Sequence, residues 1–179
     1  MSRHRLPGIL FLLTILALFV RPGAAEGPPV AISEVLVGNA STNIDPTYTN
    51  YSSWIELHNT TGAAINLTGY TLSSLRDGRA TPDRYTLPSG AGSTIPAGGR
   101  VLVWYDEIGS GLHTPFELDM DGGVIELLAP NGGLVDSVTL AAQKPDLSYG
   151  RASGGGWAYF DPPTPGAANN TPAFASYVN

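Results

Sequence analysis

The segment from Val124 to Leu140, VIELLAPNGGLVDSVTL, contains the clearest local fold signal in the chain. Two mainly apolar runs, Val124–Leu128 and Leu134–Leu140, flank the turn sequence Pro130-Asn131-Gly132-Gly133. Asn and Gly tolerate the positive φ angles that tight turns between antiparallel strands require. The segment therefore predicts a β-hairpin.

Runs of the same kind occur on the N-terminal side of this hairpin, separated by turn residues. Arg100–Tyr105 (RVLVWY) is apolar on both faces and is predicted to be a central strand. No stretch keeps the apolar spacing of a helix for three turns without Gly, Pro or a β-branched residue interrupting it. The pattern predicts an all-β domain, either a two-sheet sandwich or a barrel. The other predicted strands are Val30–Val37, Trp54–His58, Ile65–Leu72, Arg84–Leu87 and Phe116–Leu118.

Composition excludes several classes of protein. Apolar residues make up 42% of the 179 residues, which is too many for a disordered chain. The sequence contains no cysteine. This excludes a disulfide framework, a thiolate zinc site, an iron–sulfur centre and a cysteine nucleophile.

The first 25 residues are predicted to be a helical signal peptide, and the resulting protein to be secreted. Arg3 and Arg5 precede an apolar run of 12 residues, Ile9–Val20, and the small residues Gly23-Ala24-Ala25 follow it. A helix of that length rises about 18 Å, which is short of the roughly 30 Å hydrocarbon core of a bilayer. The pattern favours cleavage over anchoring, so no membrane span is expected after cleavage. A domain over residues 26–169 and a short C-terminal tail over 170–179 would remain.

The remaining chain is acidic. Removal of residues 1–25 takes three arginines from the nine basic residues and none of the 15 acidic ones, which leaves a net charge of about −9. Nucleic-acid backbones are bound chiefly by clustered Lys and Arg. Nucleic acid is therefore not expected as a partner, and divalent cations or neutral polymers are favoured.

One loop is a candidate calcium site. Asp119 and Asp121 alternate before Gly122-Gly123, an arrangement similar to the opening of a calcium loop. The glutamate that completes an EF-hand is missing, because the twelfth position from Asp119 is Pro130. Asp45, Asp106 and Glu107 are further carboxylates that other loops could contribute. The alternative is a solvated Asp-Gly turn, and no other cofactor is expected.

Catalytic patterns are weak, and the chain is predicted not to be an enzyme. His58 shares a strand face with Glu56, and His113 follows a glycine-containing loop, but a structural role is favoured for each. No Gly-x-Ser-x-Gly sequence occurs. The acids are scattered over predicted loops, and none stands in an apolar setting expected to raise its pKa.

The aromatic residues suggest a ligand-binding surface. Trp54 and Trp104 are predicted to be core residues, since sandwich domains commonly bury a tryptophan. Trp157 and Tyr159 stand between a glycine run and a proline-rich segment and are predicted to lie near the surface, together with Phe160. Such rings can contact a carbohydrate or an apolar partner.

Eight short motifs, in order and at plausible spacing, resemble those of the lamin tail domain family, especially its bacterial secreted members. The resemblance covers about residues 30–169 and implies an immunoglobulin-like β-sandwich. The motifs are Ile32–Val35, Trp54–Asn59, Leu67–Leu72, Thr94–Gly99, Leu112–Thr114, Gly133–Val138, Ser148–Arg151 and Pro163–Asn169.

The resemblance implies a module that binds or tethers rather than reacts. The sequence is therefore expected to encode a secreted or cell-surface, non-catalytic binding module for an extracellular protein or polysaccharide. Two alternatives remain: a calcium-assisted polysaccharide-binding domain, and an accessory domain of a secreted hydrolase system.

Overall fold

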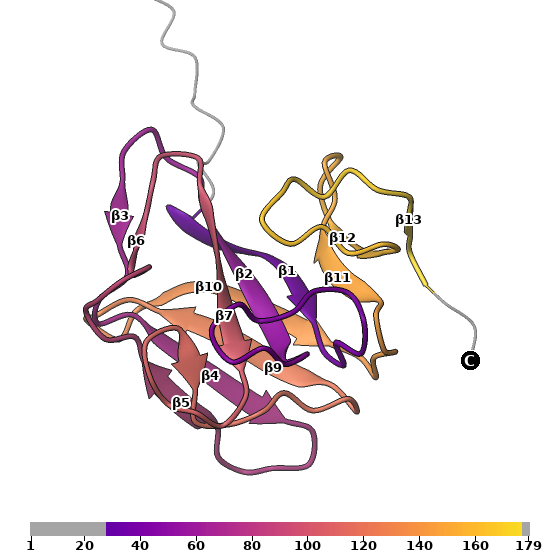
Figure 1. Cartoon of the computed structure of the whole chain (residues 1–179), viewed down its shortest axis with the longest axis horizontal. Helices are drawn as coiled ribbons and strands as arrows, with labels where there is room; N and C mark the ends of the chain where they lie inside the picture. Colours follow the sequence, from indigo (N-terminus) through magenta and orange to yellow (C-terminus); the bar gives the residue numbers. More distant parts are fainter. Residues whose placement is uncertain (1–27, 177–179) are drawn as a thin grey trace, which may run out of the picture.

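The computed structural model of the chain describes residues 28–176, which form β-strands and no helix (Figure 1). The larger of two facing sheets has seven strands in the order β13-β12-β11-β1-β2-β7-β8. Neighbouring strands are antiparallel except β7 and β8, which are parallel. The strands are β1 (Val30–Leu36), β2 (Ser53–Asn59), β7 (Arg100–Tyr105), β8 (His113–Thr114), β11 (Ser148–Arg151), β12 (Trp157–Phe160) and β13 (Ala173–Phe174).

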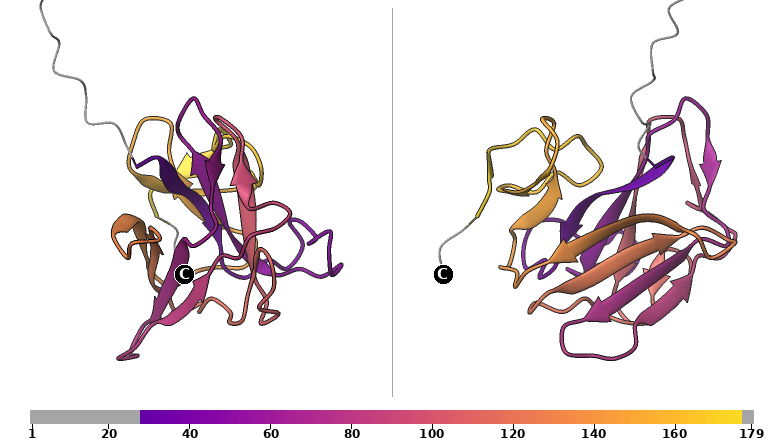
Figure 2. Two further views of the ribbon diagram at one scale, coloured as in Figure 1. Left: turned by 90° about the vertical axis from the view of Figure 1, so that its left-hand side faces the viewer. Right: turned by 180° about the vertical axis from the view of Figure 1, so that it is seen from behind.

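The smaller sheet has four strands in the order β10-β9-β4-β5, and a two-stranded pair, β3 and β6, lies at one end (Figure 2). The predicted hairpin is confirmed as β9 and β10, closed by a hydrogen bond from the Ala129 amide to the Gly133 carbonyl at 2.8 Å. The strands are β3 (Ile65–Asn66), β4 (Thr71–Arg76), β5 (Asp83–Thr86), β6 (Thr94–Ile95), β9 (Gly123–Leu128) and β10 (Leu134–Leu140).

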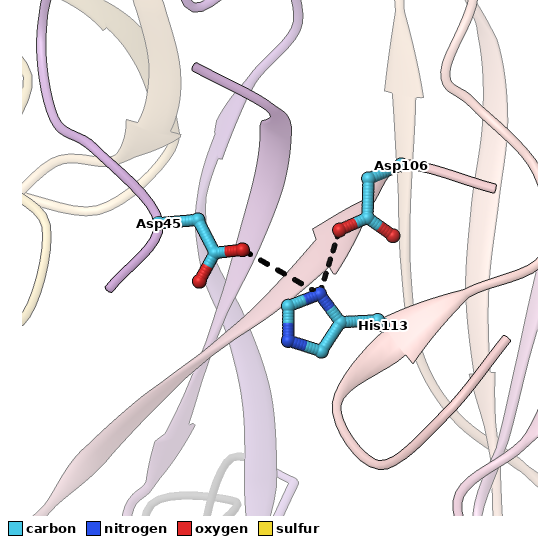
Figure 3. Close-up of side chains that lie close together, drawn as sticks. All are labelled: Asp45, Asp106 and His113. Atoms are coloured by element: carbon cyan, nitrogen blue, oxygen red, sulfur yellow. Dashed lines mark hydrogen bonds and ion pairs between the residues drawn. The ribbon is translucent and has the colours of Figure 1, made fainter. Parts of the chain in front are cut away.

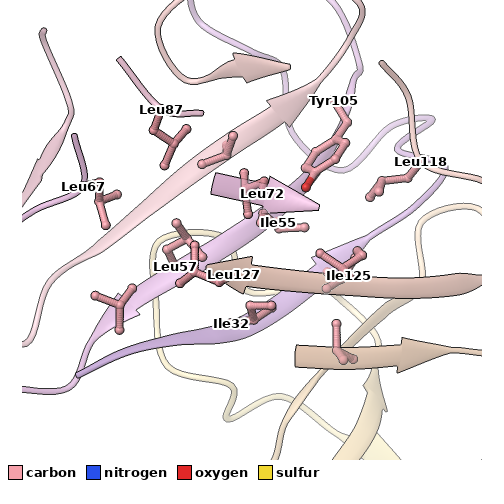
Figure 4. Close-up of a cluster of buried hydrophobic side chains, with 14 of the residues drawn as sticks. Ile32, Ile55, Leu57, Leu67, Leu72, Leu87, Tyr105, Leu118, Ile125 and Leu127 are labelled. Atoms are coloured by element: carbon pink, nitrogen blue, oxygen red, sulfur yellow. The ribbon is translucent and has the colours of Figure 1, made fainter. Parts of the chain in front are cut away.

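The two sheets enclose one main apolar core (Figure 4). Alternation along each strand supplies it, since every second side chain points to the same face. Ile55 and Leu57 on β2 and Ile125 and Leu127 on β9 are all buried in this core. The predicted two-sheet sandwich is therefore present, consistent with an immunoglobulin-like arrangement.

Strand β1 is buried along its whole length. Its pairing with β2 shifts register between Ile32 and Glu34. A bulge of this kind adds one residue to a strand. As a result Ile32 and Val35 both enter the core, while Glu34 lies on the outer face beside Glu56.

A second, smaller apolar cluster lies on the outer face of the large sheet. It consists of Leu36, Trp54 and Trp104, with Leu102 packed against them. The Trp54 indole donates a hydrogen bond to the Asn43 side chain at 2.8 Å. Asn43 belongs to the β1–β2 loop (residues 37–52), so this loop is fixed to the sheet through a buried tryptophan.

Two predicted strands differ from the structure. The segment Ile65–Leu72 is divided between β3 and β4 by a turn, in which the Tyr70 amide bonds to the Leu67 carbonyl and Gly69 has a φ of +84°. Phe116–Leu118 is not a strand, although Phe116 and Leu118 are buried core residues. Its apolar side chains were a signal of burial rather than of strand pairing.

The C-terminal region adds three strands that the apolar pattern did not predict. Trp157–Phe160 forms β12, and the prediction that this segment lies near the surface is wrong for Tyr159 and Phe160, which are buried. Trp157 is half-buried. Ala173–Phe174, within the predicted tail, pairs with β12. The predicted signal peptide lies outside the described residues, and over residues 28–176 the structure contains no apolar helix long enough to cross a membrane.

Candidate functional site

Exposed apolar side chains gather at one end of the sandwich. Over residues 28–176, six large apolar residues are strongly exposed, and four of them lie in the β1–β2 loop or the β7–β8 loop (residues 106–112). These four are Ile44, Tyr48, Tyr51 and Ile108, with exposed fractions of 48%, 46%, 47% and 38%. We call this group the loop-end patch.

Side-chain hydrogen bonds fix the β1–β2 loop that supplies most of this patch. The Asp146 carboxylate accepts hydrogen bonds from the amides of Ala40 and Ser41 and from the hydroxyls of Ser41 and Thr42. These bonds lower the pKa of Asp146 to about 2, with the Ser41 hydroxyl as the largest cause. The loop is thus positioned before any ligand arrives, which reduces the entropy lost on binding.

Beneath the patch, two carboxylates converge on one imidazole (Figure 3). The Nδ1 atom of His113 lies 2.6 Å from Oδ2 of Asp106 and 3.8 Å from Oδ2 of Asp45. The side chains of His113, Asp106 and Asp45 are 9%, 3% and 0% exposed, respectively. The ring of Tyr48 packs edge-on against His113 with 4.8 Å between ring centroids. We call Asp45, Asp106 and His113 the acid–histidine cluster.

Two surface hollows flank the acid–histidine cluster. One, of about 300 Å³, is lined by Tyr48, Trp104 and His113 among other residues. The other, of about 260 Å³, is lined by Tyr51 and Asp106 together with amide and hydroxyl groups. Each hollow therefore combines an aromatic ring with polar groups.

The calcium candidates Asp119 and Asp121 lie elsewhere. The Asp121 amide donates to the Asp119 side chain at 3.0 Å, and the Gly122 amide donates to the Asp119 carbonyl at 3.1 Å, so the segment forms a tight turn. Asp121 is exposed. Among the described residues, Asp45 and Asp106 come together with His113 rather than with this turn. A calcium site at Asp119 and Asp121 stays a prediction.

The ligand candidates Trp157 and Tyr159 belong to an aromatic row on β11, β12 and β13. The Tyr149 ring stacks on Trp157 at 5.3 Å and contacts Tyr159 at 4.7 Å between centroids, and Tyr159 lies 6.3 Å from Phe174. The Arg151 guanidinium lies 4.8 Å from the centre of the Trp157 ring. Most of this aromatic surface is therefore in contact with neighbouring side chains, and ligand binding there stays a prediction.

Sequence reasoning did not predict the burial of two glutamates, Glu34 and Glu56. Glu34 is fully buried and accepts hydrogen bonds from the Ser148 hydroxyl, the Thr164 amide at 3.0 Å and the Thr164 hydroxyl at 2.9 Å. Thr164 belongs to the proline-rich segment 162–169, which covers this part of the outer face. Glu34 thus holds the end of the domain against its first strand.

Glu56, the neighbour of Glu34 on β2, corrects the prediction that no acid has a raised pKa. Burial raises its pKa to about 7, although hydrogen bonds from Ser33 and Gly166 act in the opposite direction. Arg100 forms an ion pair with Glu56 at 3.0 Å. The Gly166 amide also ties Glu56 to the proline-rich segment 162–169. The pKa of the nearby His58 is lowered, mainly by burial and also by the charge of Arg100.

The raised pKa of Glu56 predicts that stability falls as pH rises. In the unfolded chain Glu56 has its ordinary pKa of 4.5, whereas in the folded chain its pKa is about 7. Below pH 4.5 both states hold the proton and the stability is fully present. Between pH 4.5 and 7 the unfolded state releases the proton first, so unfolding becomes easier by a total of about 3 kcal/mol.

Urea unfolding of the wild type and of Glu56→Gln between pH 4.5 and 8 measures this effect. The neutral Gln side chain is expected to flatten the profile over that range, whereas the exposed control Glu117→Gln should leave it unchanged. Parallel profiles for wild type and Glu56→Gln would show that Glu56 does not titrate in this window.

Comparison with known proteins agrees with this architecture. A search of curated proteins found no match. The family model described as Lamin Tail Domain matches residues 23–142, about two thirds of the chain. This match includes the two loops that carry the loop-end patch, and ends before β11, β12 and the segment 162–169. The chain belongs to the lamin tail domain family.

Proposed function

We propose that the chain is a secreted or cell-surface, non-catalytic binding module, and that it binds its ligand through the loop-end patch. The observation that supports this most strongly is the concentration of exposed Tyr48, Tyr51, Ile44 and Ile108 on two loops at one end of the sandwich. Exposed apolar groups gathered in this way mark interaction sites on soluble proteins. Export rests on the predicted signal peptide.

A neutral polysaccharide is the ligand class that this patch fits best. Tyr48 and Tyr51 each stand beside a hollow, and the hollow beside Tyr51 is lined by the side chains of Asn39, Asn50 and Ser52. Tyrosine rings can contact the apolar faces of sugars, while amides and hydroxyls bond to their hydroxyl groups. The acidic chain would repel an anionic polymer.

An extracellular protein is the second candidate. Ile44 and Ile108 are exposed by 48% and 38%, and aliphatic groups of this kind suit a protein interface better than a sugar. Tethering would follow from either ligand, because binding would hold the secreted chain at the cell exterior.

The test is a binding assay with the purified full-length mature chain. Insoluble polysaccharides and cell-envelope material are sedimented with the wild type and with the double variant Tyr48→Ala/Tyr51→Ala. We expect the wild type to be retained and the variant to lose affinity by about tenfold or more, as for central aromatic contacts elsewhere.

Two control variants make the result specific to the loop-end patch. Leu134→Ala removes an apolar side chain that is 61% exposed on β10, and Trp157→Ala alters the aromatic row. Both should bind as the wild type does. Loss of binding in Trp157→Ala, with normal binding by the double tyrosine variant, would move the site to the aromatic row.

A further inference from the structure

We propose that the acid–histidine cluster is a site for a divalent transition metal of the zinc class. Its donors are one imidazole nitrogen and two carboxylates, and the ligand atoms lie within 4.8 Å of one another. They come from three separate segments: Asp45 from the β1–β2 loop, Asp106 from the first position of the β7–β8 loop, and His113 from the start of β8. This proposal does not depend on the ligand-binding function.

The first argument is charge. Asp45 and Asp106 are both buried, and the ion-pair partner that the structure gives each of them is the same His113 imidazole. Even a protonated imidazole supplies one positive charge against two negative ones. The Asp45 carboxylate is 3.8 Å from the imidazole nitrogen, beyond hydrogen-bond distance, and is otherwise bonded to the amides of Thr47 and Tyr48. Burial of a carboxylate without a compensating cation destabilises the folded state, and a divalent ion would balance the charges of both carboxylates.

The second argument is geometry. Zinc bonds of about 2.0–2.2 Å in a tetrahedral site place ligand atoms roughly 3.3 Å apart. On zinc binding, the 2.6 Å distance from His113 Nδ1 to Asp106 Oδ2 would increase by less than about 1 Å. The 3.8 Å distance from His113 Nδ1 to Asp45 Oδ2 would decrease by about 0.5 Å. The ligand atoms of Asp45 and Asp106 lie within 4.8 Å of each other and would approach by at most about 1.5 Å.

The donor set also selects the metal. Calcium prefers six to eight oxygen ligands, whereas an imidazole with carboxylates suits zinc and its neighbours. The hollow lined by Tyr48 and His113 lies against the cluster on its His113 side. Because the ligands join the β1–β2 loop to β7 and β8, a bound ion would stiffen the loop-end patch.

Calorimetry with zinc chloride on the chelator-treated mature chain tests the proposal. We expect one ion per chain and a rise in melting temperature with zinc, since the ion binds the folded state. His113→Gln and Asp106→Asn each remove a direct ligand and should weaken zinc binding by at least about 100-fold, since loss of an outer-shell partner alone costs about 10–100-fold. The matched controls Asp119→Asn, Asp121→Asn and His58→Gln should bind zinc as the wild type does.

Several results would overturn the site. They are the absence of one-to-one zinc binding at 100 μM protein, unchanged binding in His113→Gln, and loss of binding in Asp119→Asn in place of Asp106→Asn. If circular dichroism shows that a variant does not fold, the wild type is titrated with cobalt, a paramagnetic ion of the same ligand preference, and followed by NMR. Broadening of the His113 ring signals, with those of His58 unaffected, is expected in NMR spectra, and the reverse pattern would refute the proposal.

Discussion

Replacement of Glu34 by alanine is expected to destabilise the domain by about 3–5 kcal/mol, because buried donors lose their acceptor and a cavity remains. The donors are the Ser148 hydroxyl and the amide and hydroxyl of Thr164. The segment 162–169 would lose its attachment to β1. Urea unfolding at pH 7 measures the change.

The matched control is Glu117→Ala, which removes an exposed carboxylate and should change the stability by less than about 0.5 kcal/mol. Thr164→Val tests the same contact from the covering segment and should destabilise the domain in the same direction. A loss below 1 kcal/mol in Glu34→Ala would mean that Glu34 does not hold the segment in place.

Replacement of Trp54 by alanine is expected to cost about 3–5 kcal/mol, the usual range for a fully buried aromatic residue. Trp54 is 0% exposed and is the centre of the outer-face cluster with Leu36 and Trp104. Its hydrogen bond to Asn43 would also be lost. We therefore expect the domain to become less stable and the β1–β2 loop to become mobile.

Thermal unfolding measures the loss of stability. Amide hydrogen exchange of residues 37–52 measures the mobility of the β1–β2 loop. Asn43→Ala removes the hydrogen bond but keeps the buried ring, so it should loosen the loop at a much smaller cost in stability. Unchanged exchange of the loop in Trp54→Ala would contradict the account of how the loop is fixed.

Local sequence patterns predicted much of the core but not what covers it. The alternation of Ile55 and Leu57 and the Pro-Asn-Gly-Gly turn depend on neighbouring residues, so β2 and the β9–β10 hairpin could be predicted. Glu34 and Glu56 occupy alternate positions beside apolar residues, which normally indicates a solvent-facing side. The segment that buries them lies more than one hundred residues away along the chain.

The candidate sites also depend on contacts between distant segments, which local sequence patterns do not show. Asp45, Asp106 and His113 were each identified in the sequence, but their convergence depends on where two loops fold. Trp157 and Tyr159 were predicted to lie near the surface because glycines and prolines flank them. Pairing of β12 with β11 and β13 places Tyr159 between other rings instead.

The most direct test of the proposed binding module is an NMR titration with a polysaccharide or protein that the mature chain retains. Trp104 lines the hollow beside Tyr48, whereas Trp157 lies in the aromatic row. Binding at the loop-end patch predicts that the Trp104 indole and His113 ring signals shift while the Trp157 indole signal stays in place. A shift of Trp157 with Trp104 and His113 unmoved would contradict it.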